Sequence, residues 1–304
     1  MRRMGYKGRN YTVGAASGET SVKAIKELER DDLGDELRRD LLNLASDIIW
    51  NVENGIHMHM PTHLFNSVLT RDDITVSDME ELLSDMSDEL KAIKIGCHTD
   101  NYRLIFGLGE FTCITPSSRT PNSQLSSAIL RMDKLAIIAD HIGWPFFGSP
   151  IVLDIGCAVG QRTMHQLAEL FIHNFKMLSK RTQDRLVLVN NASPKGMSVT
   201  QLYSRIYADT GIPIMADVYH HQFNAGECIE EQAVIELAMS TWPQGINPII
   251  SVSSSKKRDE AQPLLPLATH ADFIHRDIPE VTTDVLIDAG LHEVAVLDVI
   301  LKEG

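Results

Sequence analysis

Short apolar runs alternate with stretches of helical periodicity along most of this chain. The apolar runs are typical of buried strands and lie at 2–6, 56–60, 102–106, 151–153, 185–189, 213–217, 248–252 and 294–297. Apolar residues at helical spacing predict helices at about 22–28, 35–54, 76–93, 125–142, 162–178, 199–207, 230–239 and 282–288. This alternation predicts an α/β fold, a (β/α)8 TIM barrel in which residues 1–304 form a single domain.

Two glycine-rich segments do not fit nucleotide-binding loops. The Gly107-Leu108-Gly109 segment lacks the third glycine and the ribose-binding acid of a dinucleotide fold. Residues 156–160 are not followed by the Gly-Lys-Ser/Thr of a phosphate loop. We therefore expect a closed barrel instead of an open doubly wound sheet, and no nucleotide cofactor.

Composition narrows the class of protein. The chain has 304 residues, 43% of them hydrophobic, which is enough for a large core. No run of eighteen apolar residues occurs and the first residues lack the apolar segment of a secretory signal, so we expect a soluble, intracellular, cytoplasmic protein without membrane contact. The four cysteines show no C-x-x-C spacing, which indicates reduced, mostly structural thiols.

The net charge of the chain limits how it could bind nucleic acid. The formal charge of −13 repels nucleic acid on average, because non-specific DNA affinity comes from Lys and Arg that displace counterions. Any DNA-binding function must therefore rely on a local basic face. The basic segment Lys256-Lys257-Arg258 is one candidate.

Candidate chemistry lies at the carboxyl ends of the predicted strands, where barrels place their active sites. The strand at 213–217 ends in Asp217, and His220 follows three residues later. Asp154 and Asp298 end two other predicted strands, and His270 lies in the loop after the seventh. Mixed carboxylate and imidazole ligands of this kind suit one or two divalent ions, manganese or zinc.

Each of these residues also has a structural interpretation. Asp217 could cap the next turn, and Asp154 could accept hydrogen bonds from the glycine-rich backbone that follows it. His270 could be a hydrogen-bonded core histidine, and Asp298 could pair with Lys302. We favour the metal interpretation because these residues occur together as a ring at strand ends.

Other polar residues give weaker indications. His57 and His59 share one strand face and His63 falls beyond Pro61, which favours surface or substrate contacts over a ligand set. Cys157 follows a strand, but no histidine partner is evident, so nucleophilic catalysis is not expected.

At this point the sequence resembles the UV damage endonuclease family over nearly its whole length. Asn43 to Ile56 is similar to the family pattern N-L-x-x-x-x-I-L-x-x-N-x-x-x-G-I. Further similar segments, in the family's order, are Met4-Gly5-Tyr6, residues 171–178, Thr241-Trp242, Ser253-Ser254 and residues 270–274.

The resemblance implies a barrel like that of apurinic-site endonucleases, with bound divalent metals that activate water to cut DNA on the 5′ side of a lesion. Asp217, His220 and His270 match ligand positions of the family. Asp298 stands where the family has Glu, and Asp154 where it has His.

The resemblance also implies residues that contact DNA. Glu110-Phe111 matches a Gln-aromatic pair that looks like the wedge inserted at damaged bases, and Tyr6 is expected near the lesion. Lys256 and Lys257 would then contact the phosphate backbone.

Several family positions differ in this chain. The family's H-P-G-Q-F reads Gly107 to Phe111, its E-N-D reads Val189-Asn190-Asn191, and its H-L-S-S reads Ser251 to Ser254. These changes remove two histidines and the carboxylate expected to bridge two metals. We therefore expect one divalent ion, manganese first and zinc or magnesium as alternatives, held by some of Asp217, His220, His270 and Asp298. Asp154 could supplement these ligands, and Asp217 and His220 are the expected catalytic residues.

Three functional hypotheses follow. The first is a divergent UV damage endonuclease that nicks damaged double-stranded DNA 5′ to a lesion in DNA repair. The second is a metal-binding barrel enzyme acting on a sugar, polyol or nucleotide. The third is a non-catalytic scaffold.

Overall fold

The computed structural model describes residues 2–8, 30–61, 64–108, 114–115, 122–158, 160–226, 230–266 and 268–303. The strands found there are β1 Met4–Lys7, β2 Met58–Met60, β3 Arg103–Leu104, β4 Phe106–Gly107, β5 Ile151–Leu153, β6 Leu186–Val189, β7 Ile214–Asp217, β8 Ile249–Val252 and β9 Asp284–Ile287. They form one sheet in the order β3-β2-β1-β9-β8-β7-β6-β5-β4, with every pair parallel.

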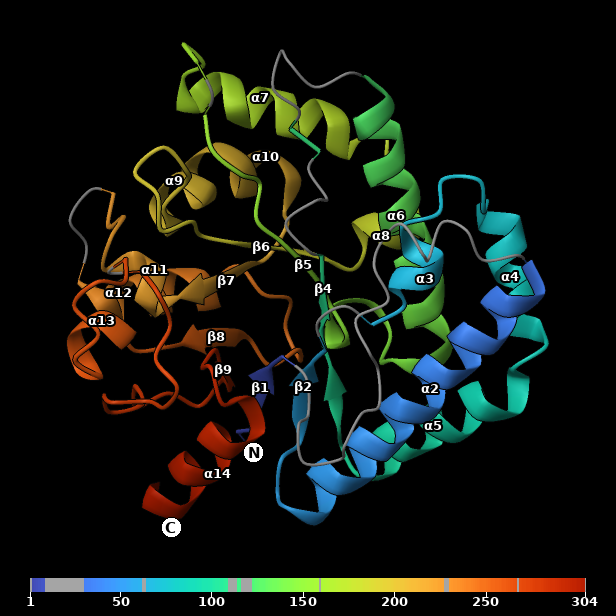
Figure 1. Ribbon diagram of the computed structural model, residues 1–304. Helices are drawn as coiled ribbons and strands as arrows, with labels where there is room; N and C mark the ends of the chain where they lie inside the picture. The colour runs from blue at the N-terminus through green and yellow to red at the C-terminus, as the bar shows by residue number, and fades with distance from the viewer. Residues whose placement is uncertain are drawn as a thin grey trace.

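The two end strands of that order are neighbours in the chain, with Ile105 alone between them. The sheet therefore curls into a nearly closed barrel with the helices on its outside (Figure 1). The predicted (β/α)8 barrel is confirmed, and the single strand expected at 102–106 is split into β3 and β4.

The helices that surround the barrel mostly fall where apolar periodicity predicted them. They are α2 Arg30–Glu53, α3 Asn66–Leu69, α4 Val76–Ser84, α5 Ser87–Thr99, α6 Asn122–Ile142, η1 Phe146–Gly148, α7 Met164–Phe175, α8 Lys180–Gln183, α9 Val199–Leu202, η2 Tyr203–Tyr207, α10 Ala208–Thr210, α11 Val218–His221, α12 Glu231–Met239, α13 Lys256–Asp259 and α14 His292–Glu303. The helix expected at 76–93 is two helices, and the capping box at its start is Thr75 with Asp78. The helix expected at 22–28 lies outside the described residues.

The last βα unit was assigned wrongly. Residues 282–288, expected as a helix, contain strand β9, and residues 294–297, expected as a strand, lie within α14. The Val285-Leu286-Ile287 run is a short buried strand, whereas the buried Ala295, Val296 and Val299 share one helix face. The strand end expected at Asp298 is therefore at Asp288.

Strand pleating decides which side chains enter the barrel. The interior cluster contains Met58, Met60, Ile105, Val152, Val187, Met215, Trp242, Ile249 and Leu286. Alternate residues such as Tyr6 and Ile287 join the layer between strands and helices. Because side chains alternate along a strand, Asp217 follows Met215 onto the interior face and Asp288 follows Leu286. Lys7 follows Gly5, which pairs with Leu286, so it shares that face.

A buried ion pair fills the amino-terminal end of the barrel. Arg103 on β3 and Asp284 on β9 lie two residues before the interior Ile105 and Leu286, and their charged atoms are 2.8 Å apart. Arg3 also bonds to Asp284 at 2.7 Å.

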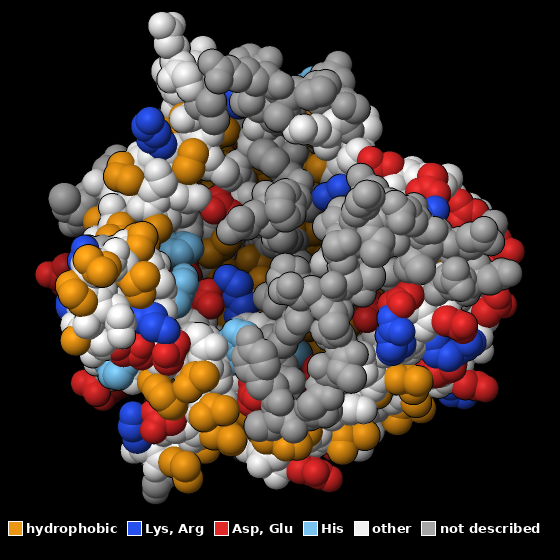
Figure 2. Space-filling view, viewed as in Figure 1, with side chains coloured by type: hydrophobic (Ala, Val, Ile, Leu, Met, Phe, Trp, Pro, Cys, Tyr) orange, Lys and Arg blue, Asp and Glu red, His pale blue; other side chains and the backbone are white. Residues whose placement is uncertain are grey.

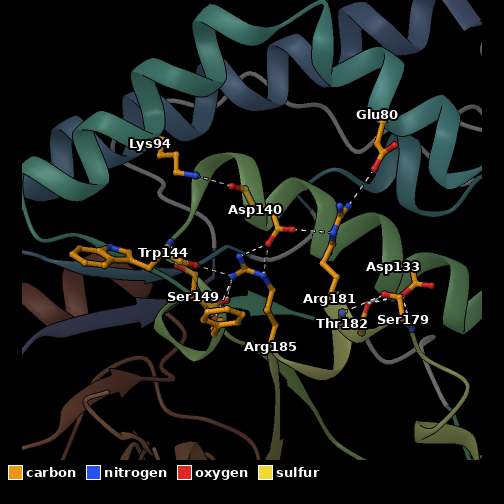
Figure 3. Close-up of polar contacts among 11 residues, drawn as sticks. Glu80, Lys94, Asp133, Asp140, Trp144, Ser149, Ser179, Arg181, Thr182 and Arg185 are labelled. Atoms are coloured by element: carbon orange, nitrogen blue, oxygen red, sulfur yellow. Dashed lines mark hydrogen bonds and ion pairs between the residues drawn. The ribbon is translucent and has the colours of Figure 1, made fainter. Parts of the chain in front are cut away.

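A second polar network ties the helices to this end. Arg185, just before β6, bonds to Asp140 on α6 and to the carbonyl oxygens of Trp144 and Ser149, as Figure 3 shows. Its guanidinium thereby anchors the end of α6 to the start of a strand.

Candidate active site

The end of β7 holds the two residues that the sequence singled out. Asp217 is 3% exposed, and its Oδ1 accepts a hydrogen bond from the His220 backbone N–H at 2.8 Å, so it caps α11. The side chain of Asn190, at the end of β6, donates to the Asp217 carbonyl oxygen at 3.0 Å and accepts from the Asp217 N–H at 2.7 Å. Asp217 is therefore held in place from both sides.

The imidazole of His220 has a fixed orientation and tautomer. Its Nδ1 lies 2.9 Å from the Asn190 carbonyl oxygen, which can only accept, so Nδ1 carries the proton. In the neutral ring the lone pair is then on Nε2, and this atom has no hydrogen-bond partner among the described residues. The Asp217 carboxylate, 3.8 Å from Nδ1, faces the same ring.

His270 is oriented in the same manner. Its Nδ1 lies 2.7 Å from the Ser253 hydroxyl, and that hydroxyl points toward the Ser254 carbonyl oxygen at 3.4 Å. In the tautomer in which Ser253 donates to that carbonyl and accepts from Nδ1, the lone pair of His270 is on Nε2. The His270 ring packs against Tyr219, and its centroid is 6.2 Å from that of His220.

Asp288 completes this side of the mouth. Its carboxylate is 15% exposed and pairs with the Lys7 ammonium, at the end of β1, at 2.7 Å. Burial by itself would raise the pKa of Asp288, but Lys7, His270 and His220 together outweigh it and hold the pKa below its ordinary value.

Two expected ligands are placed differently. Asp154 accepts hydrogen bonds from the Gly156 backbone N–H at 2.8 Å and from the Asn191 side chain at 2.5 Å, which is its structural interpretation. Asp298 lies on α14 and pairs with Lys302 one turn later. The reason for expecting Asp298 at the mouth was a strand end that does not exist there, so that prediction was wrong.

The expected DNA contacts are only partly near the mouth. Tyr6 was expected near the lesion. It is instead fully buried on the outer side of the barrel wall, where its hydroxyl is bonded to Asn51. Glu110 and Phe111 lie outside the described residues.

The basic segment at α13 adjoins the His270 loop, because the Lys256 N–H donates to the Thr269 carbonyl oxygen at 2.9 Å. The Lys256 ammonium pairs with Asp272 at 2.6 Å and is largely neutralised. Lys257 is exposed, and no ion pair to it occurs within the described ranges.

The second histidine cluster does not form at the mouth. His59 is buried beside Tyr6, with Nε2 2.9 Å from the Gly8 carbonyl oxygen. Burial lowers the pKa of His59 to about 4, so the ring is neutral. The surface position expected for it is therefore wrong, and His63 lies outside the described residues.

Figure 2 shows a hollow in the same face as Figure 1, where histidine, acidic and basic side chains lie close together. A separate cavity of about 560 Å³ lies between α4, α5, α6 and α8. Arg181 in its lining bonds to Glu80 and Asp140, and Lys94 bonds to the Asp140 carbonyl oxygen (Figure 3).

The mouth can be tested against the metal that the sequence resemblance implies. In the described part of the chain, no three His, Cys, Asp or Glu side chains lie together in a way that could hold a metal ion. The imidazoles of His220 and His270 and the carboxylates of Asp217 and Asp288 are donors of the types that divalent ions accept, but the structure does not gather three of them around one point.

Sequence reasoning missed Lys7, Asp288 and the roles of Asn190 and Ser253. The pattern of three apolar residues ended by Asp at 285–288 matches that at 151–154, and it was the signal that could have found Asp288. The other three depend on neighbouring strands and have no local signal.

The fold is similar to solved structures. The structure titled SacUVDE matches 100% of this chain and 99% of its own, with a TM-score of 0.80 and 22% identity. The structure titled AsfvAP:AG covers 99% of this chain and 98% of its own, with a TM-score of 0.52 and 9% identity. At these identities the similarity concerns the fold alone.

No curated protein matches this chain. Among the described helices, none combines the length and apolar character needed to span a membrane. The family model described as UV-endonuclease UvdE matches residues 7–303, almost the whole chain, and the chain therefore belongs to the UvdE family of UV endonucleases.

Proposed function

We propose that this protein nicks damaged double-stranded DNA on the 5′ side of a lesion, with one divalent ion bound at the barrel mouth. Family membership supports an endonuclease that acts on DNA. The observation that carries the metal proposal is the His220 tautomer: a backbone carbonyl accepts from Nδ1 and leaves Nε2 as a lone pair at the mouth.

The ion would be held by His220 and His270, with carboxylate oxygens from Asp217 and Asp288. When bound, it would supply a water molecule of lowered pKa and a positive charge for the phosphodiester. Manganese suits this mixture of nitrogen and oxygen donors, and zinc or magnesium are alternatives.

The chain's own residues perform the positioning. The Asn190 carbonyl oxygen and the Ser253 hydroxyl fix the two imidazoles, and the Asn190 side chain fixes the backbone of Asp217. Asp288 is ionised because of its neighbours, so it can act as a ligand or accept a proton from water.

DNA would approach across the mouth despite the net charge of −13. Lys257 on α13 and Lys7 on β1 would supply positive charge for the phosphate backbone. Glu110 and Phe111 are proposed as the pair that contacts the damaged bases, on the resemblance alone.

The test is cleavage of a 5′-labelled, UV-irradiated duplex with added Mn²⁺. We expect nicks at lesions. In His220→Ala the nicking rate should fall about 100-fold or more, because the ion that would stabilise negative charge on the reacting phosphodiester loses a ligand. His165→Ala is the matched control, since that histidine is exposed on α7 beside Glu169. Nicking that persists unchanged in His220→Ala, or after chelation of all divalent metal, would contradict the proposal.

A further inference from the structure

The cavity between α4, α5, α6 and α8 lies in the shell of helices around the barrel, away from the mouth. Its volume is about 560 Å³. Its lining includes Asp140 and His141, in the last turn of α6, and Arg181 on α8. Because α6 leads by way of η1 to the start of β5, and α8 to the start of β6, this shell cavity lies toward the amino-terminal ends of the strands. The mouth lies at their carboxyl ends.

The shell cavity combines apolar side chains with three cations. Leu83 and Leu90 in its lining belong to the buried core. Lys91 and Lys94 lie on α5, three residues apart and therefore on neighbouring positions of one helix face. Arg181 comes from α8, and Figure 3 shows it reaching toward Asp140 from the side opposite to Lys94. Positive charge thus borders the cavity from two helices.

The carboxylate of Asp140 does not neutralise the lysines. Its Oδ1 lies 2.9 Å from Nε of Arg185, and its Oδ2 lies 2.9 Å from Nε of Arg181, so two guanidinium groups share one negative charge. The Lys94 ammonium bonds to the Asp140 backbone carbonyl oxygen at 2.8 Å, which carries no net charge. Within the ranges that the structure describes, neither Lys91 nor Lys94 has an ion pair.

The second carboxylate of the lining, Glu80, is weakly held. Its distance to Nη1 of Arg181 is 3.4 Å, and the two side chains are 53% and 41% exposed, so solvent screens their attraction. An entering anion can therefore replace Glu80 at little cost. With three cations against two carboxylates, the lining is net positive in a chain whose formal charge is −13.

Neutral donors supplement the cations. Ser84 and Ser87 contribute hydroxyl groups to the lining. Burial lowers the pKa of His141 and the charge of Lys94 lowers it further, so near neutral pH the ring is mostly uncharged and keeps one N–H donor. The lining can thus donate to several oxygen atoms of one anion.

We propose that the shell cavity binds a small ligand that carries a phosphate group, of about the size of a mononucleotide. Lys91 and Lys94 would meet the phosphate as point charges, and Arg181 through paired N–H donors. A phosphate monoester carries nearly two negative charges and three terminal oxygens, so it can bridge α5 and α8, which a single carboxylate does less well.

The size of the shell cavity indicates the rest of the ligand. A volume of about 560 Å³ exceeds what a phosphate ion alone requires and lies within the range of roughly 300–1,000 Å³ typical of small-molecule sites. The apolar surface of Leu83 and Leu90 would contact the body of the ligand, as it could a nucleobase. The cavity is separate from the mouth, so this inference does not depend on the function proposed above.

The test is calorimetric titration of the full chain with deoxyadenosine monophosphate (dAMP), without divalent metal, and with deoxyadenosine as the comparison that lacks phosphate. We expect dAMP to bind at millimolar concentrations or below, and deoxyadenosine at least about tenfold more weakly. Lys91→Gln and Lys94→Gln should each weaken dAMP binding about tenfold, because each removes one charge-assisted hydrogen bond. Lys91 is exposed, so Lys91→Gln serves if Lys94→Gln unfolds.

A gain of affinity gives a further test that misfolding cannot imitate. Glu80→Gln releases Arg181 and should tighten dAMP binding about threefold. Lys302→Gln, on the distant helix α14, and Lys257→Gln, on α13 beside the mouth, should leave dAMP affinity unchanged. Lys257→Gln also distinguishes the shell cavity from binding at the mouth.

Three results would overturn the inference. The first is no dAMP binding at millimolar concentrations, and the second is equal binding of dAMP and deoxyadenosine. The third is dAMP affinity that is unchanged in folded Lys91→Gln and Lys94→Gln; if Lys257→Gln weakens it instead, the ligand binds at the mouth. Nicking of irradiated duplex tests the proposed function separately, and its failure would leave dAMP binding in the shell cavity unaffected.

Discussion

Replacing Asp284 with alanine should destabilise the barrel more than most single substitutions. The carboxylate is fully buried at the amino-terminal end of the barrel. It accepts hydrogen bonds from the Arg3 backbone and guanidinium, from Arg103 and from the Asn247 amide. Burial lowers the pKa of Arg103 to about 10, and Asp284 acts against that lowering.

The size of the effect follows from what the substitution leaves behind. Arg103 is 3% exposed, so removing its partner leaves a buried guanidinium that only carbonyl oxygens solvate, among them that of Gly148. Breaking a buried pair in this way costs about 3–5 kcal/mol. With an unfolding entropy of about 2.1 cal/mol/K per residue, this corresponds to a decrease in Tm of roughly 5–8 °C for a chain of this length.

Urea unfolding followed by circular dichroism measures this loss. Asp298→Asn is the control, because its pair with Lys302 is exposed and should change stability by less than about 0.5 kcal/mol. Adding Arg103→Met to Asp284→Ala should recover part of the loss, since the unpaired charge is removed. The reasoning is refuted if Asp284→Ala costs less than about 1 kcal/mol, or if the double variant shows no recovery.

Three other substitutions give separate tests. Asn190→Ala should lower the free energy of unfolding in urea by about 2 kcal/mol, because the backbone of Asp217 loses two hydrogen bonds. The same change should weaken Mn²⁺ binding about 10- to 100-fold. Values equal to those of the unchanged protein in both measurements would contradict this. Burial lowers the pKa of Lys134 to about 8, so between about pH 8 and 10.5 the unfolded chain binds more protons than the folded one. The free energy of unfolding should therefore rise with pH over this range by roughly 1–3 kcal/mol. Lys134→Met should flatten that rise, and an equal rise in both proteins would show that Lys134 is not its cause. Lys257→Gln should lower the slope of the logarithm of duplex affinity against the logarithm of salt concentration by about 1, as measured by anisotropy titration. Lys256→Gln should change this slope less, because Lys256 pairs with Asp272. Equal slopes for the two variants would show that the pairing has no influence.

The parts of the fold that the sequence predicted are those with a strong local pattern. The 213–217 strand and its Asp217-x-x-His220 continuation were recognisable because an apolar run ends abruptly in polar residues, and the structure places them as expected. The amphipathic helices at α2, α6 and α12 likewise contain enough turns for their periodicity to be distinct.

The last βα unit was misjudged because its local pattern is ambiguous. Val294-Ala295-Val296-Leu297 contains β-branched residues and reads as a strand, yet it forms one turn of a helix whose buried face continues to Val299. The three apolar residues of β9 are too few to distinguish a strand from a helical turn. Only the parallel pairing of β9 with β1 and β8 settles the assignment, and that pairing is a long-range property.

The same limit applies to the site. Lys7 and Asp288 are 281 positions apart, so no sequence window contains both. The tautomer of His220 depends on a carbonyl oxygen thirty residues away, at the end of another strand. The sequence shows which residues have side chains of metal-ligand type. It does not show which atoms orient those side chains or which charges lie beside them.

The pairing of β1 with β9 has a consequence for biosynthesis. The first strand emerges from the ribosome long before its neighbour, and at about 5–20 residues per second the interval is roughly 15–55 s. During that time β1 has an unpaired edge and Lys7 has no Asp288 to contact. Nascent chains would therefore depend on chaperones or on provisional packing against α2, and the barrel mouth would acquire its arrangement of charges only near the end of translation.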